Sequence, residues 1–528
     1  MVGGNIHLRS FRYDHYTLDM KRVSSGISPI IAVDRKANKP LHKQIYDAYR
    51  AMIVGRNLRA GQQIPASRTL ASDLKISRIP VLTAYAQLLA EGYFESRVGA
   101  GTFVCSSLPD QTTSSEGRTK QSMPVRVAKR IVARRALRLP AYEGVPWLRG
   151  LGAFSVSQPA YDQFPFQVWS TLVMRHCRNP HASDLHYGGP MGLGPLREAI
   201  CAYLRTARAV HCDPEQVMVV SGSQQALEIC ARVLLDTKDS AWVEEPGYWL
   251  TRHVLTLAGC LLVPVPVDAE GLDVTAGTKR CRKARAVFVA PSHQYPLGAT
   301  MSASRRLQLL QWAESSGCWI VEDDYDSEYR YGSMPIASLQ GLDANSRVIY
   351  MGTFSKTLFP SLRLGYVVIP RDLVSRFAAI RQAMDIGSPY LYQAVLTDFM
   401  NEGHFARHIR RMRLLYNDRR TALIDSLRTE FGSAVEVHGA EAGMHCLVTF
   451  PGSFADRVIA QHAAREKLWL TPLSPSYLGK ATRQGFVLGF SSTPAAEMPS
   501  AVQHLRKVLT SHGRLPIRNK KDTLAHAM

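Results

Sequence analysis

Apolar residues in the first hundred positions recur at the spacing of an α-helix. One helix is predicted after Pro40, with five apolar residues on a single face: Leu41, Ile45, Tyr49, Met52 and Ile53. A short helix is predicted over 67–74 with Ser67 as its N-cap, and a longer one over 78–90 with Ser77 as its N-cap. The stretch therefore predicts three helices, the last two separated by a tight turn.

A hairpin pattern follows the third helix. Residues 92–104 form two short apolar strands around a turn that contains Gly99 and Gly101. Three helices and a hairpin define a winged helix-turn-helix, an α+β fold whose third helix is narrow enough to enter a DNA major groove. A small protein-interaction domain is the alternative, because a fold does not fix a function.

The expected DNA contacts follow from this geometry. Arg78 and Ser77 lie at the start of the third helix, nearest the base edges and the phosphates. The complete set of predicted contacts is Arg68, Ser77, Arg78, Thr83, Tyr85, Arg97 and Gly99. The core-facing side of the same helix is expected to carry Val81, Tyr85, Leu88 and Leu89.

Beyond about residue 147, apolar strands alternate with helical patterns. Strands are predicted to begin near Val217, Ala241, Ala286 and Cys318, and an apolar helix follows the first of them. This alternation is typical of an α/β fold with a largely parallel sheet. Ligands are expected at the carboxyl ends of the strands, where open α/β sheets bind them.

The length of the chain and the distribution of its charge indicate more than one domain and an anionic partner for the N-terminal part. At 528 residues the chain is too long for a single core. Residues 1–150 contain 24 Lys and Arg against 10 Asp and Glu, which is two thirds of the net charge of +21. Such asymmetry favours a polyanionic partner for the N-terminal part, although a basic surface can also serve solubility alone.

Other compositional features narrow the class of protein. No run of about twenty apolar residues is present, and the N-terminus lacks a signal-peptide core, so we expect a cytoplasmic protein without membrane contact. The nine cysteines are scattered without a CxxC pair, which favours reduced thiols over a disulfide framework or a zinc site.

The expected domain organisation has five parts: an N-terminal tail over 1–36, the winged helix-turn-helix over 37–106, a flexible basic linker over 107–146, the α/β domain over 147–511 and a C-terminal tail over 512–528. The linker is polar and rich in turn residues, then basic. Its basic run consists of Arg126, Lys129, Arg130, Arg134, Arg135 and Arg138. These side chains could follow DNA phosphates or form a solvated face.

One stretch of the α/β domain, Met351–Tyr366, surrounds Lys356 with candidate phosphate ligands. Thr353 and Ser355 precede the lysine, and Arg363 follows it by seven residues. This order suits a lysine that carries an aldehyde cofactor, with hydroxyls and a guanidinium for the cofactor's phosphate. A lone lysine is more often an exposed surface residue, so the interpretation depends on the remaining motifs.

Three further motifs complete a pyridoxal phosphate site. The glycine-containing turn 221–225 opens a helix, where free N–H groups suit phosphate. Tyr248 follows a strand and could stack on a planar ring. Asp323 ends a strand and could keep a ring nitrogen protonated. The acidic residues after Asp323 lack the spacing of a calcium loop, so no metal is expected.

The N-terminal segment PLHKQIYDAYRAMIVGRNLRAGQQIPASRTLASDLKISRIPVLTAYAQLLAEGYFESRVGAGTFV resembles the DNA-binding domain of GntR-type bacterial regulators. The resemblance implies binding to double-stranded operator DNA. Ala66 and the pair Ile79-Pro80 depart from the usual pattern, and they leave the operator sequence open.

Residues 150–510 resemble fold-type I aminotransferases, which use pyridoxal 5′-phosphate. The resemblance implies that Lys356 forms the Schiff base, Asp323 contacts the ring nitrogen and Tyr325 contacts the ring oxygen. Tyr248 resembles the stacking aromatic residue. The residues similar to phosphate ligands are Gly222, Ser223, Gln224, Thr353, Ser355 and Arg363. Tyr187 resembles a tyrosine that reaches the phosphate of a neighbouring subunit, which implies a head-to-tail homodimer.

The fusion of the two parts is similar to MocR/GabR-type transcriptional regulators, whose signatures resemble YGGPMG, SGSQQAL, EEPGY, PSHQYPLG, VEDDYDSEYRY and MGTFSKTLFPSLRLGY. Val487 stands where aminotransferases have an arginine for the substrate carboxylate, and an apolar residue cannot replace that pairing. Leu250 replaces an arginine of GABA-sensing regulators, although Arg252 is close in sequence. Tyr295 replaces an asparagine.

These features predict a transcription regulator that holds pyridoxal phosphate as effector or co-sensor, with vitamin B6, amine or amino-acid metabolism as its field. The small-molecule effector is expected to be pyridoxal phosphate itself, an amine or an amino acid. Two alternatives remain. One is an active aminotransferase with an added DNA-binding domain, in which Lys356 is catalytic. The other is a cofactor-free body that serves only to dimerise.

Overall fold

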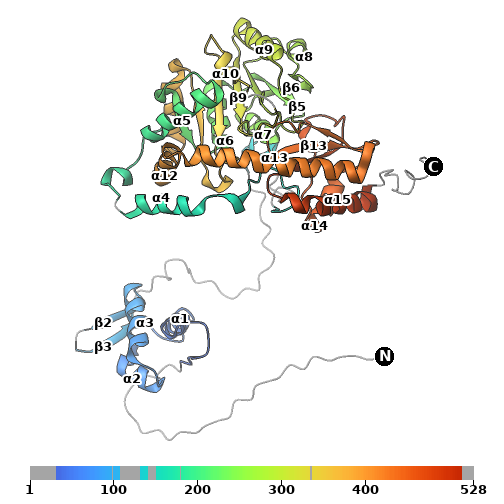
Figure 1. Ribbon diagram of the computed structural model, residues 1–528. Coiled ribbons are helices and arrows are strands. Elements are labelled where there is room, and N and C mark those ends of the chain that lie inside the picture. Colours follow the sequence, from blue (N-terminus) through green and yellow to red (C-terminus); the bar gives the residue numbers. More distant parts are fainter. Residues whose placement is uncertain are drawn as a thin grey trace, which may run out of the picture. The chain divides into compact units, whose positions relative to one another are not determined.

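The computed structural model describes residues 31–97, 99–106, 131–140, 150–178, 180–332 and 336–513 (Figure 1). Most of the predicted N-terminal tail, the linker segments 107–130 and 141–149, and the segment 514–528 lie outside the described residues. So do Arg126, Lys129 and Arg130 of the basic run. The contacts divide the chain into two units, Met1–Arg130 and Ile131–Met528, and each is described by itself.

The first unit is a three-helix bundle with a small antiparallel sheet. Its helices are α1 (Leu41–Val54), α2 (Ser67–Asp73) and α3 (Arg78–Ala90), and its strands are β1 (Gln63–Ile64), β2 (Phe94–Arg97) and β3 (Gly101–Val104). The sheet order is β1-β3-β2. The predicted helices and hairpin are therefore confirmed, and β1 is an additional strand that the sequence pattern did not predict.

The start of α2 differs from the expectation. Ala66, not Ser67, occupies the N-cap position, and the Ser67 hydroxyl accepts a hydrogen bond from Arg78 Nε at 3.1 Å. Ser77 occupies the N-cap of α3 as predicted, but its side chain makes no capping hydrogen bond. Ser67 therefore ties the start of α3 to α2 instead of capping its own helix.

An aromatic cluster forms the core of this unit. The rings of Tyr49, Tyr85 and Phe94 meet edge to face, with centroids 5.3–5.7 Å apart. The Tyr85 hydroxyl lies 3.2 Å from that of Tyr49 and donates to the Pro65 carbonyl at 2.8 Å. Tyr85 is only 5% exposed, so the prediction that it contacts DNA is wrong and its predicted core position is confirmed. Leu89, expected in the core, is exposed.

The second unit is built on an eight-stranded sheet of order β4-β11-β10-β9-β8-β5-β6-β7. Its strands are β4 (Val217–Val220), β5 (Ser240–Glu245), β6 (Leu261–Asp268), β7 (Gly271–Leu272), β8 (Ala286–Val289), β9 (Trp319–Asp324), β10 (Val348–Thr353) and β11 (Gly365–Val368). The five central strands from β10 to β6 run parallel, whereas β11 and β7 are antiparallel to their neighbours. The predicted α/β fold with a largely parallel sheet is confirmed.

Helices cover both faces of this sheet, and the strand sequences show why. Ile320 and Val321 are neighbours in β9, yet they pack into different apolar clusters. One cluster includes residues of α6 (Ser223–Leu234), α7 (Trp249–Ala258) and α11 (Val374–Asp385), and the other includes residues of α9 (Ala303–Ser316). Because side chains of a strand alternate between faces, continuous apolar strands require a cover on each side.

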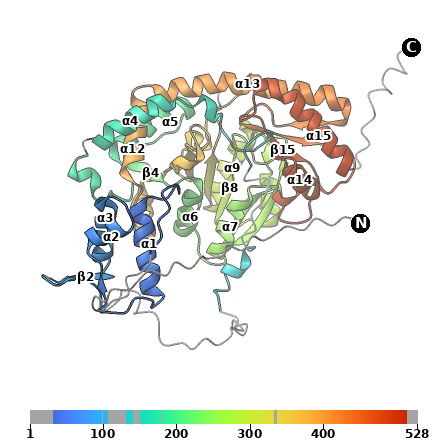
Figure 2. The ribbon, with the colours of Figure 1, turned by 90° about the horizontal axis from the view of Figure 1, so that it is seen from below.

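A C-terminal lobe adds a second, antiparallel sheet of order β12-β13-β15-β14. Its strands are β12 (Glu436–His438), β13 (His445–Thr449), β14 (Thr471–Pro472) and β15 (Phe486–Gly489). The helices α13 (His404–Phe431) and α15 (Met498–Gly513) pack against one another beside this sheet, as both views show (Figure 2). They share one apolar core with α4 (Phe166–Arg178), α5 (Gly194–Arg208) and α12 (Tyr390–Asn401).

The linker region shows one short described element. Residues 136–138 form a 3₁₀ turn, and the arginines of the basic run at 134, 135 and 138 are exposed. Within the described part of the chain, no helix has both the length and the apolar character needed to cross a membrane.

Candidate functional site

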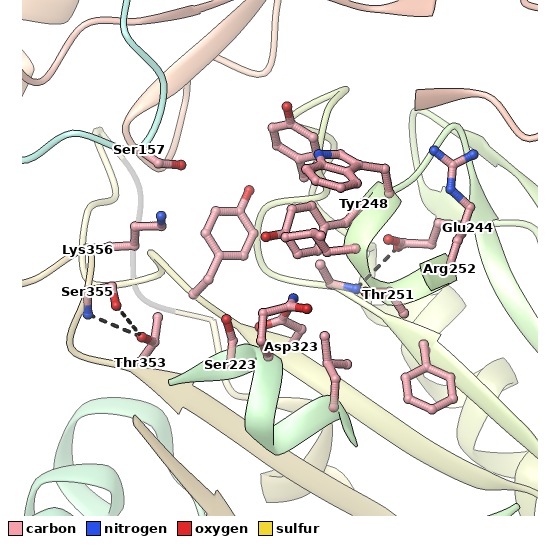
Figure 3. A pocket seen from close by; sticks show the side chains of 18 of the residues that line it. Ser157, Ser223, Glu244, Tyr248, Thr251, Arg252, Asp323, Thr353, Ser355 and Lys356 are labelled. Atoms are coloured by element: carbon pink, nitrogen blue, oxygen red, sulfur yellow. Dashed lines mark hydrogen bonds between the residues drawn. The ribbon is translucent and has the colours of Figure 1, made fainter. Parts of the chain in front are cut away.

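A cavity of about 370 Å³ lies at the carboxyl ends of the central strands (Figure 3). Predicted cofactor residues from five separate segments line it: Ser223, Gln224, Tyr248, Asp323, Tyr325, Thr353, Ser355, Lys356 and Arg363. Eight of them end a strand, follow one or open the helix after one, and Arg363 lies just before β11. The fold therefore brings together residues that are up to 140 positions apart in the sequence, as the parallel sheet predicts.

Lys356 follows β10 and lines the cavity. Burial lowers the pKa of its amine to about 8, with Arg363 adding to that shift, while Asp326 and Asp323 oppose it. A lower pKa increases the fraction of unprotonated amine near neutral pH, which is the form that attacks an aldehyde. Lys356 is therefore chemically suited to form a Schiff base.

Asp323 ends β9 and presents a carboxylate to the same cavity. Its Oδ1 atom is buried without a hydrogen-bond partner among the described residues. The pKa of this carboxyl is raised to about 7, chiefly by burial and also by the nearby Asp324 and Asp326, whereas Lys356 opposes the shift. A protonated ring nitrogen would provide both the missing N–H donor and the missing positive charge.

The start of α6 forms an anion cradle. Gly222, at its N-cap, has a φ of +95°, and a Cβ there would lie 3.0 Å from Arg363 Nη2. Arg363 donates to the Ser221 carbonyl at 2.7 Å, which fixes its guanidinium beside the helix N-terminus. Gln224 Nε2 is buried without a partner in the described part of the chain. A phosphate would be bound well here, because the positive N-terminus of α6, the Arg363 guanidinium and the unpaired Gln224 amide all offer N–H donors.

Hydroxyl groups extend this cradle toward the lysine. Thr353 Oγ1 lies 3.1 Å from Ser355 Oγ and accepts from the Ser355 N–H at 3.2 Å (Figure 3). Asp323, the Gly222 cradle and these hydroxyls fit the ring nitrogen and the phosphate of pyridoxal phosphate, with Lys356 available for the aldehyde. Gly222 is not itself among the lining residues, and it acts through the space that it leaves for Arg363.

Aromatic residues form a further wall. The rings of Tyr248 and Tyr295 meet edge to face with centroids 5.8 Å apart, and both line the cavity. Tyr187 does not line it and is 80% exposed, so within one chain it is not brought to the predicted site. Its predicted role toward a neighbouring subunit stays a prediction.

The Val487 position lies behind the cavity, not in it. Val487 is fully buried in β15 and packs in a small cluster with Leu297, Leu447 and Leu473. Tyr295 packs against this cluster and also lines the cavity. The two replacements that the sequence showed, Val487 and Tyr295, thus pack against one another in one apolar cluster.

Arg252 and Glu244 also line the cavity, and sequence reasoning assigned neither of them a role. Arg252 is 6% exposed; its Nη2 donates to the Pro475 carbonyl at 2.9 Å, and its Nε lacks a partner within the described residues. Burial raises the pKa of the Glu244 carboxyl to about 8, so it is largely protonated near neutral pH. The only sequence signal for Glu244 was its place in the motif EEPGY, which does not show which way the side chain faces.

The predicted DNA contacts of the first unit form an exposed set, apart from Tyr85. Arg68, Ser77, Arg78, Thr83, Arg97 and Gly99 are all exposed. Thr83 donates to the Ile79 carbonyl at 3.1 Å, and the Arg97 guanidinium lies 4.5 Å from the centre of the Phe103 ring and pairs with Glu95. Ile79, beside Arg78, is 73% exposed on α3. This surface is open to a polyanion.

The two units and the cavity together define a class: a winged helix-turn-helix DNA-binding domain joined to a fold-type I, pyridoxal phosphate-type body. The model for "Bacterial regulatory proteins, gntR family" matches residues 41–104, and the model for "Aminotransferase class I and II" matches residues 153–505. The chain therefore belongs to the MocR/GabR type of transcriptional regulators, in which these two families are fused.

Similar proteins agree with this assignment. The probable rhizopine catabolism regulatory protein MocR of Rhizobium meliloti is 39% identical over 491 residues, which cover 92% of this chain and 98% of that protein. The pyridoxine biosynthesis regulator PdxR of Corynebacterium glutamicum is 29% identical over 462 residues, covering 88% and 94%. The structure of LysN, an α-aminoadipate aminotransferase from Thermus thermophilus, matches with a TM-score of 0.67 and 26% identity over 72% of this chain and 97% of that one.

These comparisons confirm the predicted fold and family. Pyridoxal 5′-phosphate, the predicted cofactor, is the cofactor of this aminotransferase family, and the LysN structure contains a phosphopyridoxyl compound.

Proposed function

We propose that this transcription regulator binds pyridoxal phosphate covalently through Lys356 and uses it as effector or co-sensor for operator binding. The observation that carries the proposal is the unpartnered Asp323 Oδ1 together with the Gly222–Arg363 cradle, both at the cavity that Lys356 lines. Buried polar atoms without partners are uncommon in folded proteins, because each costs the free energy of its lost hydration. A bound cofactor relieves that cost.

Each residue has a separate task in this proposal. Arg363, the α6 N-terminus and the hydroxyls of Thr353 and Ser355 hold the phosphate, and Tyr248 covers the ring. Asp323 holds a proton on the ring nitrogen. When bound, pyridoxal phosphate supplies an aldehyde that exchanges between Lys356 and free amines, and a ring that withdraws electrons. Pyridoxal phosphate itself, an amine or an amino acid can therefore change the state of the pocket.

Recognition without sustained turnover is the function that the cavity wall favours. Val487 lies in an apolar cluster against which Tyr295 packs, so the usual carboxylate-binding arginine has no equivalent at this position. The alternative is an active aminotransferase with a DNA-binding domain. Arg252 is the observation in its favour, because a buried guanidinium with a free Nε lines the same cavity and could hold a carboxylate.

We further infer a head-to-tail homodimer with shared sites. Tyr187 is 80% exposed, and Leu185 beside it is 76% exposed. Large exposed side chains in one segment suit an interface between protein chains. In this arrangement the Tyr187 hydroxyl would complete the phosphate site of the second copy.

Two measurements on the full-length protein test the proposal. Borohydride reduction after addition of pyridoxal phosphate, followed by peptide mass spectrometry, is expected to label Lys356 and to label nothing in Lys356→Ala. Footprinting on an operator selected by the protein from random DNA is expected to change when pyridoxal phosphate is added to cofactor-free protein. An unlabelled Lys356, or a footprint that does not respond, would contradict the proposal. Steady conversion of an amino donor and a 2-oxo acid would instead favour the aminotransferase.

A further inference from the structure

A buried cluster of titratable side chains lies directly behind the cavity. It consists of His293, Asp326 and His445, all less than 3% exposed, and none of them is among the residues that line the cavity. Their possible ligand atoms lie within 4.8 Å of one another. Their neighbours Tyr325 and Lys356 do line the cavity, so the cluster is one layer away from the proposed cofactor.

His293 is placed between acceptors on both ring nitrogens. Its Nδ1 lies 3.1 Å from each oxygen of Asp326, and its Nε2 lies 3.3 Å from the Gly439 carbonyl oxygen. A carbonyl or a carboxylate can only accept, so a hydrogen on each nitrogen satisfies both contacts. This geometry favours the imidazolium form. The pKa of His293 is accordingly raised, because the Asp326 carboxylate outweighs the effect of burial.

The contact leaves no room for an ion between the two side chains. Asp326 also accepts from the Met444 N–H at 3.2 Å. A Cβ on Gly443, whose φ is +69°, would lie 2.1 Å from His293 Nδ1 and 2.4 Å from Asp326 Oδ2. The backbone therefore closes tightly over the pair, and a direct hydrogen-bonded ion pair describes it better than a metal site.

His445 completes the cluster as a neutral ring. Its ring is tilted by 39° against that of His293, with centroids 4.6 Å apart, and its Nε2 lacks a partner among the described residues. Burial, His293 and Lys356 hold its pKa well below the usual value. The cluster thus contains one positive and one negative charge.

Tyr325 connects this pair to the cavity. Its hydroxyl lies 3.3 Å from His293 Nδ1. When His293 Nδ1 carries the hydrogen that Asp326 requires, this nitrogen has no lone pair left. It therefore cannot accept a hydrogen bond from Tyr325, and toward His293 the phenol oxygen acts only as an acceptor. The phenol hydrogen must then point elsewhere; this hydroxyl has no other hydrogen-bond partner among the described residues, and Tyr325 lines the cavity.

We propose that His293 is a positioning residue for the cofactor pocket: paired with Asp326, it turns the Tyr325 hydroxyl hydrogen toward the cavity and balances the Asp326 charge beside Lys356. The inference rests on the proposed function only where it takes Tyr325 and Lys356 as cofactor contacts. The groups that act on Lys356 are Asp323, Asp326, Arg363 and His445, and those that act on His293 are Asp326, Tyr325, His445 and Glu441.

Two substitutions should shift the pKa of Lys356 in opposite directions. His293→Gln keeps a donor for Asp326 but removes the positive charge, so the uncompensated carboxylate should favour protonated Lys356. Asp326→Asn removes the carboxylate, which among nearby charges favours protonation of Lys356 most. We expect the pKa of Lys356 to rise by about one unit in the first variant and to fall by about one unit in the second.

The direct test uses cofactor-free, full-length protein. The pH dependence of Lys356 acylation by an amine-reactive reagent, followed by peptide mass spectrometry, gives the midpoint for each variant. His438→Gln is the matched control, since His438 is a half-buried histidine outside the cluster that contacts Thr449 at 3.1 Å; its midpoint should not move. Shifts in the same direction, or no shift, in the two cluster variants would overturn the inference. If His293→Gln does not fold, His293→Asn replaces it in the same comparison with Asp326→Asn.

A second test addresses the tyrosine. His293→Gln should weaken binding of pyridoxal phosphate when Tyr325 is present and should have little further effect in Tyr325→Phe, because the two residues act through one hydrogen bond. Additive losses would contradict the positioning role. If pyridoxal phosphate never attaches to the wild-type protein, the proposed function fails, whereas the acylation midpoints still decide the charge balance around Lys356.

Discussion

The two units present their candidate residues in opposite ways. Arg68, Arg78 and Arg97 of the winged helix unit are exposed. In the large unit, Lys356 and Asp323 have strongly shifted pKa values, and Asp323 Oδ1 lacks a partner within the described chain. Exposed arginines are hydrated and cost little without DNA. Buried unpaired groups cost free energy until a ligand arrives.

Under the proposed function, this difference favours the large unit as the sensor. A ligand that binds only the folded state stabilises it in proportion to the logarithm of its concentration, and the same free energy is available to shift a conformational equilibrium. The DNA surface can be complete before DNA binds, whereas in the proposed function Asp323 Oδ1 and Gln224 Nε2 of the pocket gain a partner only from the ligand. The following substitutions test this contrast.

Lys356→Ala should have the largest effect. Without the amine, covalent attachment of pyridoxal phosphate should be lost completely, and its visible absorbance band with it. Operator affinity in the cofactor-free state should remain within a few-fold of wild type, because Lys356 belongs to the unit without the DNA surface. Absorbance spectra and anisotropy titrations measure the two effects; a persistent covalent band would refute the role of Lys356.

Arg78→Ala should weaken operator binding by about ten- to a hundredfold, since a base-edge arginine contributes about 1–3 kcal/mol. The spectrum of bound pyridoxal phosphate should not change. Gel-shift titration at fixed salt measures the affinity. Equal losses on operator and on random DNA would show that Arg78 contacts only phosphates.

Asp323→Asn should stabilise the cofactor-free protein but weaken its binding of pyridoxal phosphate. In the cofactor-free protein the pKa of Asp323 is raised to about 7. Ionised Asp323 therefore destabilises the folded state, and this destabilisation grows as the pH rises from about 4 through 7. Asparagine removes that penalty, so the cofactor-free protein should gain about 4 kcal/mol of stability at pH 8 and little at pH 4. Affinity for pyridoxal phosphate should fall. Thermal unfolding across this pH range with and without cofactor checks both signs; a loss of stability at pH 8 in the cofactor-free state would contradict the assignment.

Tyr85→Phe should have the smallest effect. It removes the hydroxyl that bonds to Pro65 and Tyr49, so the winged helix unit should lose about 1 kcal/mol of stability. Operator affinity at low temperature should stay unchanged, because the ring is buried. A selective loss of operator binding would restore Tyr85 as a DNA contact.

Much of the fold could be predicted from the sequence because local signals agreed with it. The predicted third helix over 78–90 matches α3, and the strand at Val217 matches β4. The two-residue strand β1 is too short to leave a periodic pattern, and it exists because it pairs with β3. The sequence predicted Tyr85 both as a core residue and as a DNA contact, because helical spacing alone does not show which residues at the edge of a core are buried.

The sequence predicted the motifs that line the cavity, but not the buried side chains that pack behind those motifs. Lys356 and Asp323 stand in recognisable stretches, and the strand ends bring them together. The contacts of His293 with Asp326 and Gly439 join residues 33 and 146 positions apart. Only the folded chain shows that these side chains share one buried site behind Tyr325.

Operator affinity of the cofactor-free protein, measured by anisotropy while pyridoxal phosphate is added, tests the central claim most directly. Coupling between the pocket and the DNA surface predicts a change of about 5- to 150-fold in wild type and no change in Lys356→Ala. Equal operator affinity of the wild-type protein with and without saturating pyridoxal phosphate would contradict the account.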